Sequence, residues 1–299
     1  MKKNNKITSL LVVIILSGLA VFGAFADTIY NYDGYRYTII NNFSVSVCGA
    51  DTGLSQPVIP ATINSREVVD ISNRAFMNNT EITSVDFSEA THLQRIGLYA
   101  FKGCSNLSSD LIIPQTITTL ETAAFEDCVN LSSVTISANV TEIAAQCFNR
   151  CSMLSSVTLH DGITSFGNYA FANCPNLTYL ELSKDVTSIA SSAFKNDTNL
   201  ILGVWYDSYA HQFAKKHNIP FKLLDEFMLG DANMDGFVNI NDVTAVQRNL
   251  AELEDFNELQ ESAANANCDG DLDISDATAI QMFIAEYKVP YPIGELITQ

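Results

Sequence analysis

Residues 101–151 read FKGCSNLSSDLIIPQTITTLETAAFEDCVNLSSVTISANVTEIAAQCFNRC, and one pattern recurs within them. A small residue precedes a phenylalanine, a cysteine follows three positions after it, and then come a leucine and a short alternating segment. Six copies lie between about Val58 and Leu200, with phenylalanines spaced by 25, 24, 23, 23 and 23 residues: Phe76, Phe101, Phe125, Phe148, Phe171 and Phe194. This period predicts a solenoid, because one copy cannot bury its own apolar side whereas stacked copies share a core.

Each copy contains one expected strand with an apolar and a polar face. In one copy Leu131, Val134 and Ile136 fall on one face, while Ser133 and Thr135 fall on the other. We expect these strands to pair in parallel between copies. A second apolar set in each copy then closes the back of the stack.

An open stack needs caps at both ends to stay soluble. Tyr30 to Val47 alternates in polarity and turns at Asp33-Gly34, which predicts an N-terminal capping hairpin. Asp207 to His217 predicts a terminal helix, followed by a last short strand at 219–221. We expect His211 and His217 of this helix to be exposed.

Cysteine occupies the same slot in four copies, and polar residues occupy it in the terminal ones: Cys104, Cys128, Cys151 and Cys174, with Asn79 and Asp197 at the ends. Disulfides between copies are one interpretation, since neighbouring strands lie about 4.8 Å apart. Buried thiols that fill one slot per copy are the other. We favour thiols, because packing alone explains the spacing.

The Ala-Phe…Cys signature, together with Ile59-Pro60 and Ile113-Pro114, resembles the leucine-rich repeats of bacterial surface proteins over roughly residues 28–224. This resemblance implies parallel strands with short helical or turn backs. It also implies a module that binds a protein or another surface ligand, whose identity the sequence does not give.

A second duplication, with a period of 34 residues, lies near the C-terminus. Its copies read DANMDGFVNIND at 231–242 and NANCDGDLDISD at 265–276. Oxygen-bearing side chains fall at loop positions 1, 3, 5, 9 and 12 and glycine at position 6, the spacing that Ca²⁺ requires. An acidic loop without metal is the alternative, and it is stronger for the second loop, where Asn265 replaces the usual aspartate at position 1.

Two such loops, a helix after each, and the ending at 289–294 resemble a dockerin over about residues 228–295. Dockerins are calcium-dependent modules that bind cohesin domains of a cellulosome scaffold, so the resemblance implies two bound Ca²⁺ ions. The implied ligands of the first ion are Asp231, Asn233, Asp235, Asp242, the Phe237 carbonyl and, through water, Asn239. Those of the second are Asn265, Asn267, Asp269, Asp276, the Asp271 carbonyl and, through water, Asp273.

The same resemblance implies a cohesin-binding surface at loop positions 10 and 11 and at positions 17 and 18 of the following helix. These residues are Ile240, Asn241, Gln247 and Arg248 in the first copy, and Ile274, Ser275, Gln281 and Met282 in the second. The copies agree at isoleucine and glutamine but differ at Arg248 and Met282, so docking in two orientations stays open.

The chain begins like an exported protein, with early lysines, an apolar run from Ile7 to Leu19 and a small-x-small cleavage site at 24–26. A membrane anchor is the alternative, but this run is shorter than the roughly 20 residues of a spanning helix. We therefore expect a signal peptide at 1–26, a repeat domain at 27–225 and a dockerin domain at 226–299. The mature protein is then secreted and extracellular, with no membrane association after cleavage. The linker 223–227 lacks the Pro, Thr and Ser content that gives reach, which predicts a limited range of domain orientations.

The net charge is −18, and residues 226–299 contribute 15 acidic and two basic side chains. Such acidity argues against nucleic acid as a partner, since phosphate binding requires clustered Lys and Arg. No catalytic motif is present, so the expected fold is α+β and the expected function is that of a secreted, non-catalytic cellulosome-associated protein. The alternatives are an accessory carbohydrate-active enzyme of polysaccharide catabolism, with an active site in the repeats, and a purely structural spacer.

Overall fold

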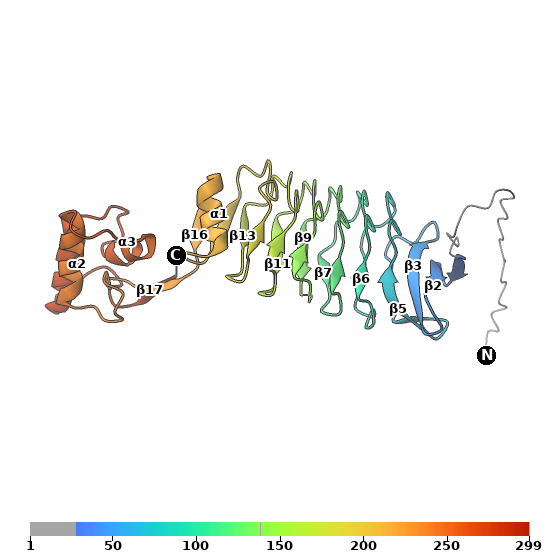
Figure 1. Ribbon diagram of the computed structural model, residues 1–299, viewed down its shortest axis with the longest axis horizontal. Coiled ribbons are helices and arrows are strands. Elements are labelled where there is room, and N and C mark those ends of the chain that lie inside the picture. The colour runs from blue at the N-terminus through green and yellow to red at the C-terminus, as the bar shows by residue number, and fades with distance from the viewer. Residues whose placement is uncertain (1–27, 138, 299) are drawn as a thin grey trace.

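The computed structural model describes residues 28–137 and 139–298 of the chain. The expected signal peptide at 1–26 lies outside the described residues. The strands stack along the long axis of an elongated solenoid, and a small helical tail follows at its C-terminal end (Figure 1). None of the helices in the described part of the chain has the length and apolar character needed to cross a membrane.

The N-terminal cap is an antiparallel meander of β1 (Tyr30–Tyr32), β2 (Tyr35–Ile39) and β3 (Ser44–Ala50), which confirms the expected hairpin. Asp33 and Gly34 both have positive φ, at 47° and 83°, as a type I′ turn requires. The third strand pairs in parallel with β5 (Arg66–Ile71), which also pairs with β4 (Thr62–Ile63), and the cap is thereby joined to the first copy.

Parallel ladders follow on both sides of the stack. On the front, β7 (Leu111–Ile113), β9 (Ser133–Ile136) and β11 (Ser156–Leu159) form one ladder, and β13 (Tyr179–Glu181), β15 (Ile201–Val204) and β16 (Phe221–Leu223) form another. On the back, β6 (Arg95–Ile96) and β8 (Thr119–Leu120) extend the sheet of β5, while β10 (Glu142–Ile143), β12 (Ser165–Phe166) and β14 (Ser188–Ile189) form a separate ladder. Ser133 lies opposite Ser156, and Val134 opposite Val157, so equivalent residues of successive copies are in register.

The backs of the copies consist of turns and two-residue strands, and no helix lies among the described residues before α1. The expectation of helical backs is therefore wrong, whereas that of turn backs is confirmed. Two residues in each of the first five copies have left-handed φ, for example Ala123 at 54° and Asp127 at 59° on either side of Phe125. Such residues interrupt a right-handed helix after one turn.

The repeated phenylalanines form one buried column. The first five rings stack at centroid distances of 4.9, 5.1, 5.6 and 5.2 Å, with interplanar angles of 9° or less. The N–H of Phe125 donates to the carbonyl of Cys147 in the next copy at 2.9 Å, and Phe101 bonds in the same way to Ala124 at 2.7 Å. The residue before each phenylalanine must be small because it lies inside this column, and Cys147 meets that requirement as alanine does.

The four repeated cysteines are thiols in the structure. Each Sγ donates to the carbonyl of the phenylalanine in the preceding copy, for example Cys128 to Phe101 at 3.2 Å and Cys151 to Phe125 at 3.3 Å. Burial raises the pKa of the Cys104 thiol to about 12. These thiols fill a slot and satisfy a buried carbonyl, and they are poor nucleophiles because they stay protonated.

The last copy departs from this arrangement, because Asp197 occupies the cysteine slot. Its Oδ1 accepts the N–H of Cys174 at 2.6 Å, while its buried Oδ2 has no partner. Burial raises the pKa of this carboxyl to about 7, although the N–H of Cys174 opposes the shift. The four cysteines that occupy this slot in other copies each donate a hydrogen bond from it. Asp197 can donate a hydrogen bond only when its carboxyl is protonated.

We predict that Asp197→Asn stabilises the repeats at pH 8 by about 1 to 2 kcal/mol, a value discounted for partial solvent screening. Between pH 4 and 7 the folded state retains a proton that the unfolded state has lost, so this carboxyl lowers stability as pH rises through that window. Urea unfolding at several pH values should show the gain at pH 8 and none at pH 4. The exposed Asp185→Asn is the control, and an identical pH profile for both variants would contradict the prediction.

The C-terminal cap is α1 (Tyr209–His217), with Ser208 as N-cap and Asn218 as a left-handed C-cap. The expected terminal helix is thus confirmed, and the last strand, β16, lies two residues later than expected. His211 is only 3% exposed, so its expected exposure is wrong. Its ring packs against Tyr206 and Phe221, and Glu258 of the tail lies against it as well.

The tail contains β17 (Glu226–Met228), α2 (Ile240–Leu250), α3 (Glu258–Ala264), α4 (Ile274–Ile284) and β18 (Leu296–Thr298). Its two terminal strands pair in antiparallel fashion, so the ends of the tail are joined, and α2 packs against α4. The core of the repeats ends at Leu223, and a second core begins at Phe227.

Candidate functional site

The duplicated loops of the tail have closely similar hydrogen bonding. At position 12, Asp242 accepts the N–H groups of Asn233 at 3.1 Å and Asn239 at 2.8 Å. Its counterpart Asp276 accepts the equivalent groups at 3.1 and 2.9 Å. Each loop is therefore closed by a carboxylate that holds positions 3 and 9, and the residue at position 9 caps the helix that follows.

Glycine at position 6 makes the turn in each loop. Gly236 has φ of 87° and Gly270 has φ of 94°, and open space surrounds the place of a Cβ atom at both. Conformation alone therefore requires glycine at these positions. The side-chain oxygens of positions 3 and 5 accept N–H groups two residues further on, at Asn233 and Asp235 in the first loop and at Asn267 and Asp269 in the second.

Position 1 distinguishes the two loops. Asp231 accepts the N–H of Asp235 at 3.0 Å and that of Gly236 at 2.8 Å. In the second loop, the side-chain oxygen Oδ1 of Asn265 is buried and has no hydrogen-bond partner. A buried acceptor without a donor lowers the stability of the folded state. A bound cation or a hydrogen-bond donor would remove this cost.

The buried carboxylates of the loops also favour a cation. Asp242 and Asp276 are fully buried. Burial raises the pKa of Asp242, its backbone hydrogen bonds lower it, and repulsion from Asp231 and Asp235 adds to the increase. Burial likewise raises the pKa of Asp276. No ion pair within the described ranges neutralises a carboxylate of either loop.

The donor set is mixed rather than a cage of carboxylates. Within residues 28–137 and 139–298, no group of three or more His, Cys, Asp and Glu side chains is arranged to hold a metal ion. Each loop supplies amide and main-chain oxygens besides its carboxylates, namely those of Asn233 and Phe237 in the first and of Asn265, Asn267 and Asp271 in the second. Such hard oxygen donors suit Ca²⁺ rather than a soft metal.

All eight residues of the expected cohesin-binding surface are exposed. Ile240 and Ile274 are 59% and 61% exposed, although each begins a helix that packs against the other. Val238 and Leu272, two residues earlier, are half-buried and pack against the core of the tail. The duplication therefore places an isoleucine in the same exposed position at the start of α2 and of α4.

The front of the repeats contains a cleft where the strand ladder is interrupted. It has a volume of about 290 Å³ and lies between residues 84–88 and β7. Asp86 and Asp110 border it, Ile112 is 58% exposed beside them, and the buried hydroxyl of Ser109 has no partner. Sequence periodicity does not reveal this cleft, because the copies on either side differ from the regular period by only one or two residues.

Sequence reasoning also missed the residues that join the two cores. Glu258 and Leu259 follow Asn257, whose side chain accepts the N–H groups of Leu259 and Gln260 and so begins α3. The asparagine with a glutamine three residues later is a recognisable helix-start signal. Nothing in the local sequence, however, indicates that Glu258 lies against α1.

The stacked copies, parallel ladders and continuous core define a leucine-rich-repeat solenoid, a fold whose extended face suits protein binding. Residues 69–201 are similar, in six copies, to the family described as "BspA type Leucine rich repeat region". Among curated proteins, none matches the chain.

Several solved structures are similar to the chain. A leucine-rich cell surface protein from Faecalibacterium prausnitzii A2-165 is 26% identical, with a TM-score of 0.43 and coverage of 58% of this chain. A leucine-rich repeat protein of T. pallidum is 17% identical, with a TM-score of 0.36 and coverage of 58% of this chain and 70% of its own. The chain spans about half, 54%, of the length of the F. prausnitzii protein.

Proposed function

We propose that the chain is a secreted, non-catalytic, cellulosome-associated protein, in which a calcium-dependent dockerin binds a cohesin and the repeats bind a protein or surface ligand. The main support for a calcium tail is the unpartnered Oδ1 of Asn265, which occupies position 1 of a loop whose duplicate has aspartate there. The match to repeat families ends at residue 201, so the dockerin assignment depends on the loops and their exposed helix starts.

The ions would act on the carboxylates of the loops. Asp231, Asp235 and Asp242 repel one another in the first loop, and positive charge among them removes that repulsion. When bound, Ca²⁺ supplies a divalent charge and binds several oxygens at once. The chain's own contribution is to hold those oxygens in place with the glycine turn and the backbone hydrogen bonds, and to present the starts of α2 and α4 to a partner.

We propose that the repeats bind their ligand on the front face, at the cleft beside Ile112. An exposed apolar side chain between the carboxylates Asp86 and Asp110 favours a partner that combines an apolar group with a basic one. Binding of the full chain to arrays of glycans and cell-surface proteins should weaken in Ile112→Asp. It should be unchanged in Thr158→Asp, which alters the equivalent outward position two copies along. Release of sugar from plant polysaccharides by the purified chain would contradict a non-catalytic role.

We predict that calorimetry of the full chain detects two Ca²⁺ ions and that Asp242→Asn weakens the first by at least about tenfold, or about 1.4 kcal/mol. The substitution removes a charge from position 12 while conserving shape. Chelation should abolish the helical signal of the tail and leave the repeats folded, because the core of the repeats consists of large apolar side chains. A chain that gives no heat with millimolar CaCl₂ would contradict the calcium proposal.

Asn265→Asp should tighten the second site, because it restores a carboxylate at position 1. We expect an increase in affinity of about three- to tenfold in calorimetry, with the first site unchanged. The control is Asn31→Asp, which makes the same change in net charge at an exposed position of β1, far from the loops in the sequence. Equal or weaker binding by Asn265→Asp would show that this oxygen is not a ligand.

We predict that Ile240→Asp and Ile274→Asp each weaken binding to a panel of cohesin domains, and that the double variant abolishes it. Each change places a charge on an exposed apolar position that is suited to burial against a partner. The control is Leu253→Asp, since Leu253 is a comparably exposed apolar residue beyond the end of α2. If only one single variant loses binding, docking has one orientation. If the double variant binds like the parent, this surface is not the cohesin-binding surface.

A further inference from the structure

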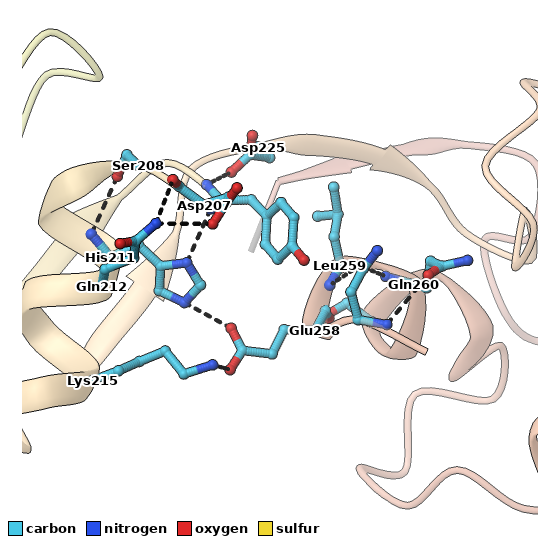
Figure 2. Close-up of polar contacts among 12 residues, drawn as sticks. Asp207, Ser208, His211, Gln212, Lys215, Asp225, Glu258, Leu259 and Gln260 are labelled. Carbon is cyan, nitrogen blue, oxygen red and sulfur yellow. Dashed lines mark hydrogen bonds and ion pairs between the residues drawn. The ribbon is translucent and has the colours of Figure 1, made fainter. Parts of the chain in front are cut away.

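The first turn of α3 covers the cap helix of the repeats. His211 of α1 accepts the N–H of Asp207 at its Nδ1, 3.0 Å away, so the neutral ring carries its proton on Nε2. This Nε2 lies 2.7 Å from Oε2 of Glu258, the first residue of α3. Figure 2 shows the Glu258 carboxylate pointing at both His211 and Lys215.

Lys215, one turn along α1, pairs with the other oxygen of the same carboxylate. Burial alone raises the pKa of Glu258, but the hydrogen bond from Lys215 and the positive charge of Lys215 lower it overall. The neighbouring Leu259 packs against the core of the repeats and against that of the tail. One carboxylate and one apolar side chain of α3 therefore join the two halves of the chain.

Two hydrogen bonds hold the start of the linker, Leu224 and Asp225, against the repeats. The N–H of Leu224 donates to the carbonyl of Val204 at 2.8 Å, and the N–H of Tyr206 donates to the Asp225 carboxylate. The chain enters the core of the tail at Phe227. Rotation of the tail is therefore confined to the few residues around Glu226, and the contact made by α3 decides whether such rotation occurs.

Both calcium loops are attached to α3. Gly230, directly before position 1 of the first loop, donates its N–H to the carbonyl of Ala263 at 2.8 Å. The side chain of Gln260 reaches the carbonyl of Ala232 at 3.4 Å. At its C-terminal end, α3 is capped by Asn265, which is position 1 of the second loop. The position of α3 is therefore tied to the conformation of both loops.

We propose that α1 is a docking surface for the first turn of α3, and that calcium binding in the tail, on which this inference rests, sets this contact. Ordered loops hold α3 so that Glu258 and Leu259 reach α1, and the tail then has one orientation relative to the repeats. Without ions α3 loses its supports at both ends and unfolds with the rest of the tail, so Glu258 and Leu259 leave α1 and the tail takes many positions relative to the repeats.

The test is small-angle X-ray scattering of the full chain in calcium and in EGTA, with calorimetry of calcium binding on the same samples. We expect a narrow distribution of domain separations in calcium and a broad one in EGTA. The variant Glu258→Ala/Leu259→Ser should give the broad distribution even in calcium, while its calcium heat persists. Glu295→Ala is the control, because it removes an exposed acidic residue of the tail that has no ion pair among the described contacts.

The outcomes separate the two proposals. If the parent chain gives no calcium heat, the calcium tail is wrong and the inference fails with it. If the heat is normal but scattering is the same in calcium and EGTA, only the coupling to orientation is wrong. If Glu258→Ala/Leu259→Ser scatters like the parent in calcium, α3 does not hold the tail on α1.

Discussion

The fold depends on one constraint: the buried main-chain groups of each copy are satisfied by the copy that follows it. The N–H of Phe101 bonds to a carbonyl of the next copy, and its carbonyl accepts the thiol of Cys128 there. Because both partners lie at fixed positions, the number of residues per copy is held near 23, and the rings stack almost face to face. The two longer spacings, of 25 and 24 residues, lie on either side of Phe101, in the part of the stack where the cleft beside Ile112 opens.

The constraint explains why the end of the stack is unlike its middle. The last copy has Asp197 in the slot that cysteine occupies in the four preceding copies. One oxygen of this carboxyl has no hydrogen-bond partner. Phe213 of α1 packs edge-on against Phe194 and ends the column of rings. The outer side of α1 is covered in turn by Glu258 and Leu259, so the tail acts as a second layer of the cap.

Periodicity predicted what depends on spacing: the phenylalanine column, the buried cysteine slot, the parallel pairing and the conformations of Gly236 and Gly270. Periodicity could not predict features that depend on contacts between residues far apart in the sequence. The backs are strands and turns because residues such as Ala123 adopt left-handed φ, for which alanine gives no signal. His211 lies against Glu258, and the same carboxylate pairs with Lys215 across 43 residues of sequence.

The two halves differ in what stabilises them. The repeats bury large apolar side chains, among them the column of phenylalanines. Unfolding would expose this apolar area to water, so its burial stabilises the repeats. The core of the tail is small, and its buried members are chiefly alanines: Ala232, Ala245, Ala263, Ala264, Ala266, Ala277 and Ala279. Alanine buries little area, so a domain of this size needs another source of free energy, and ligand binding to the folded state is one. On our proposal that source is calcium, and the same weakness that makes the tail depend on ions allows ions to control its orientation.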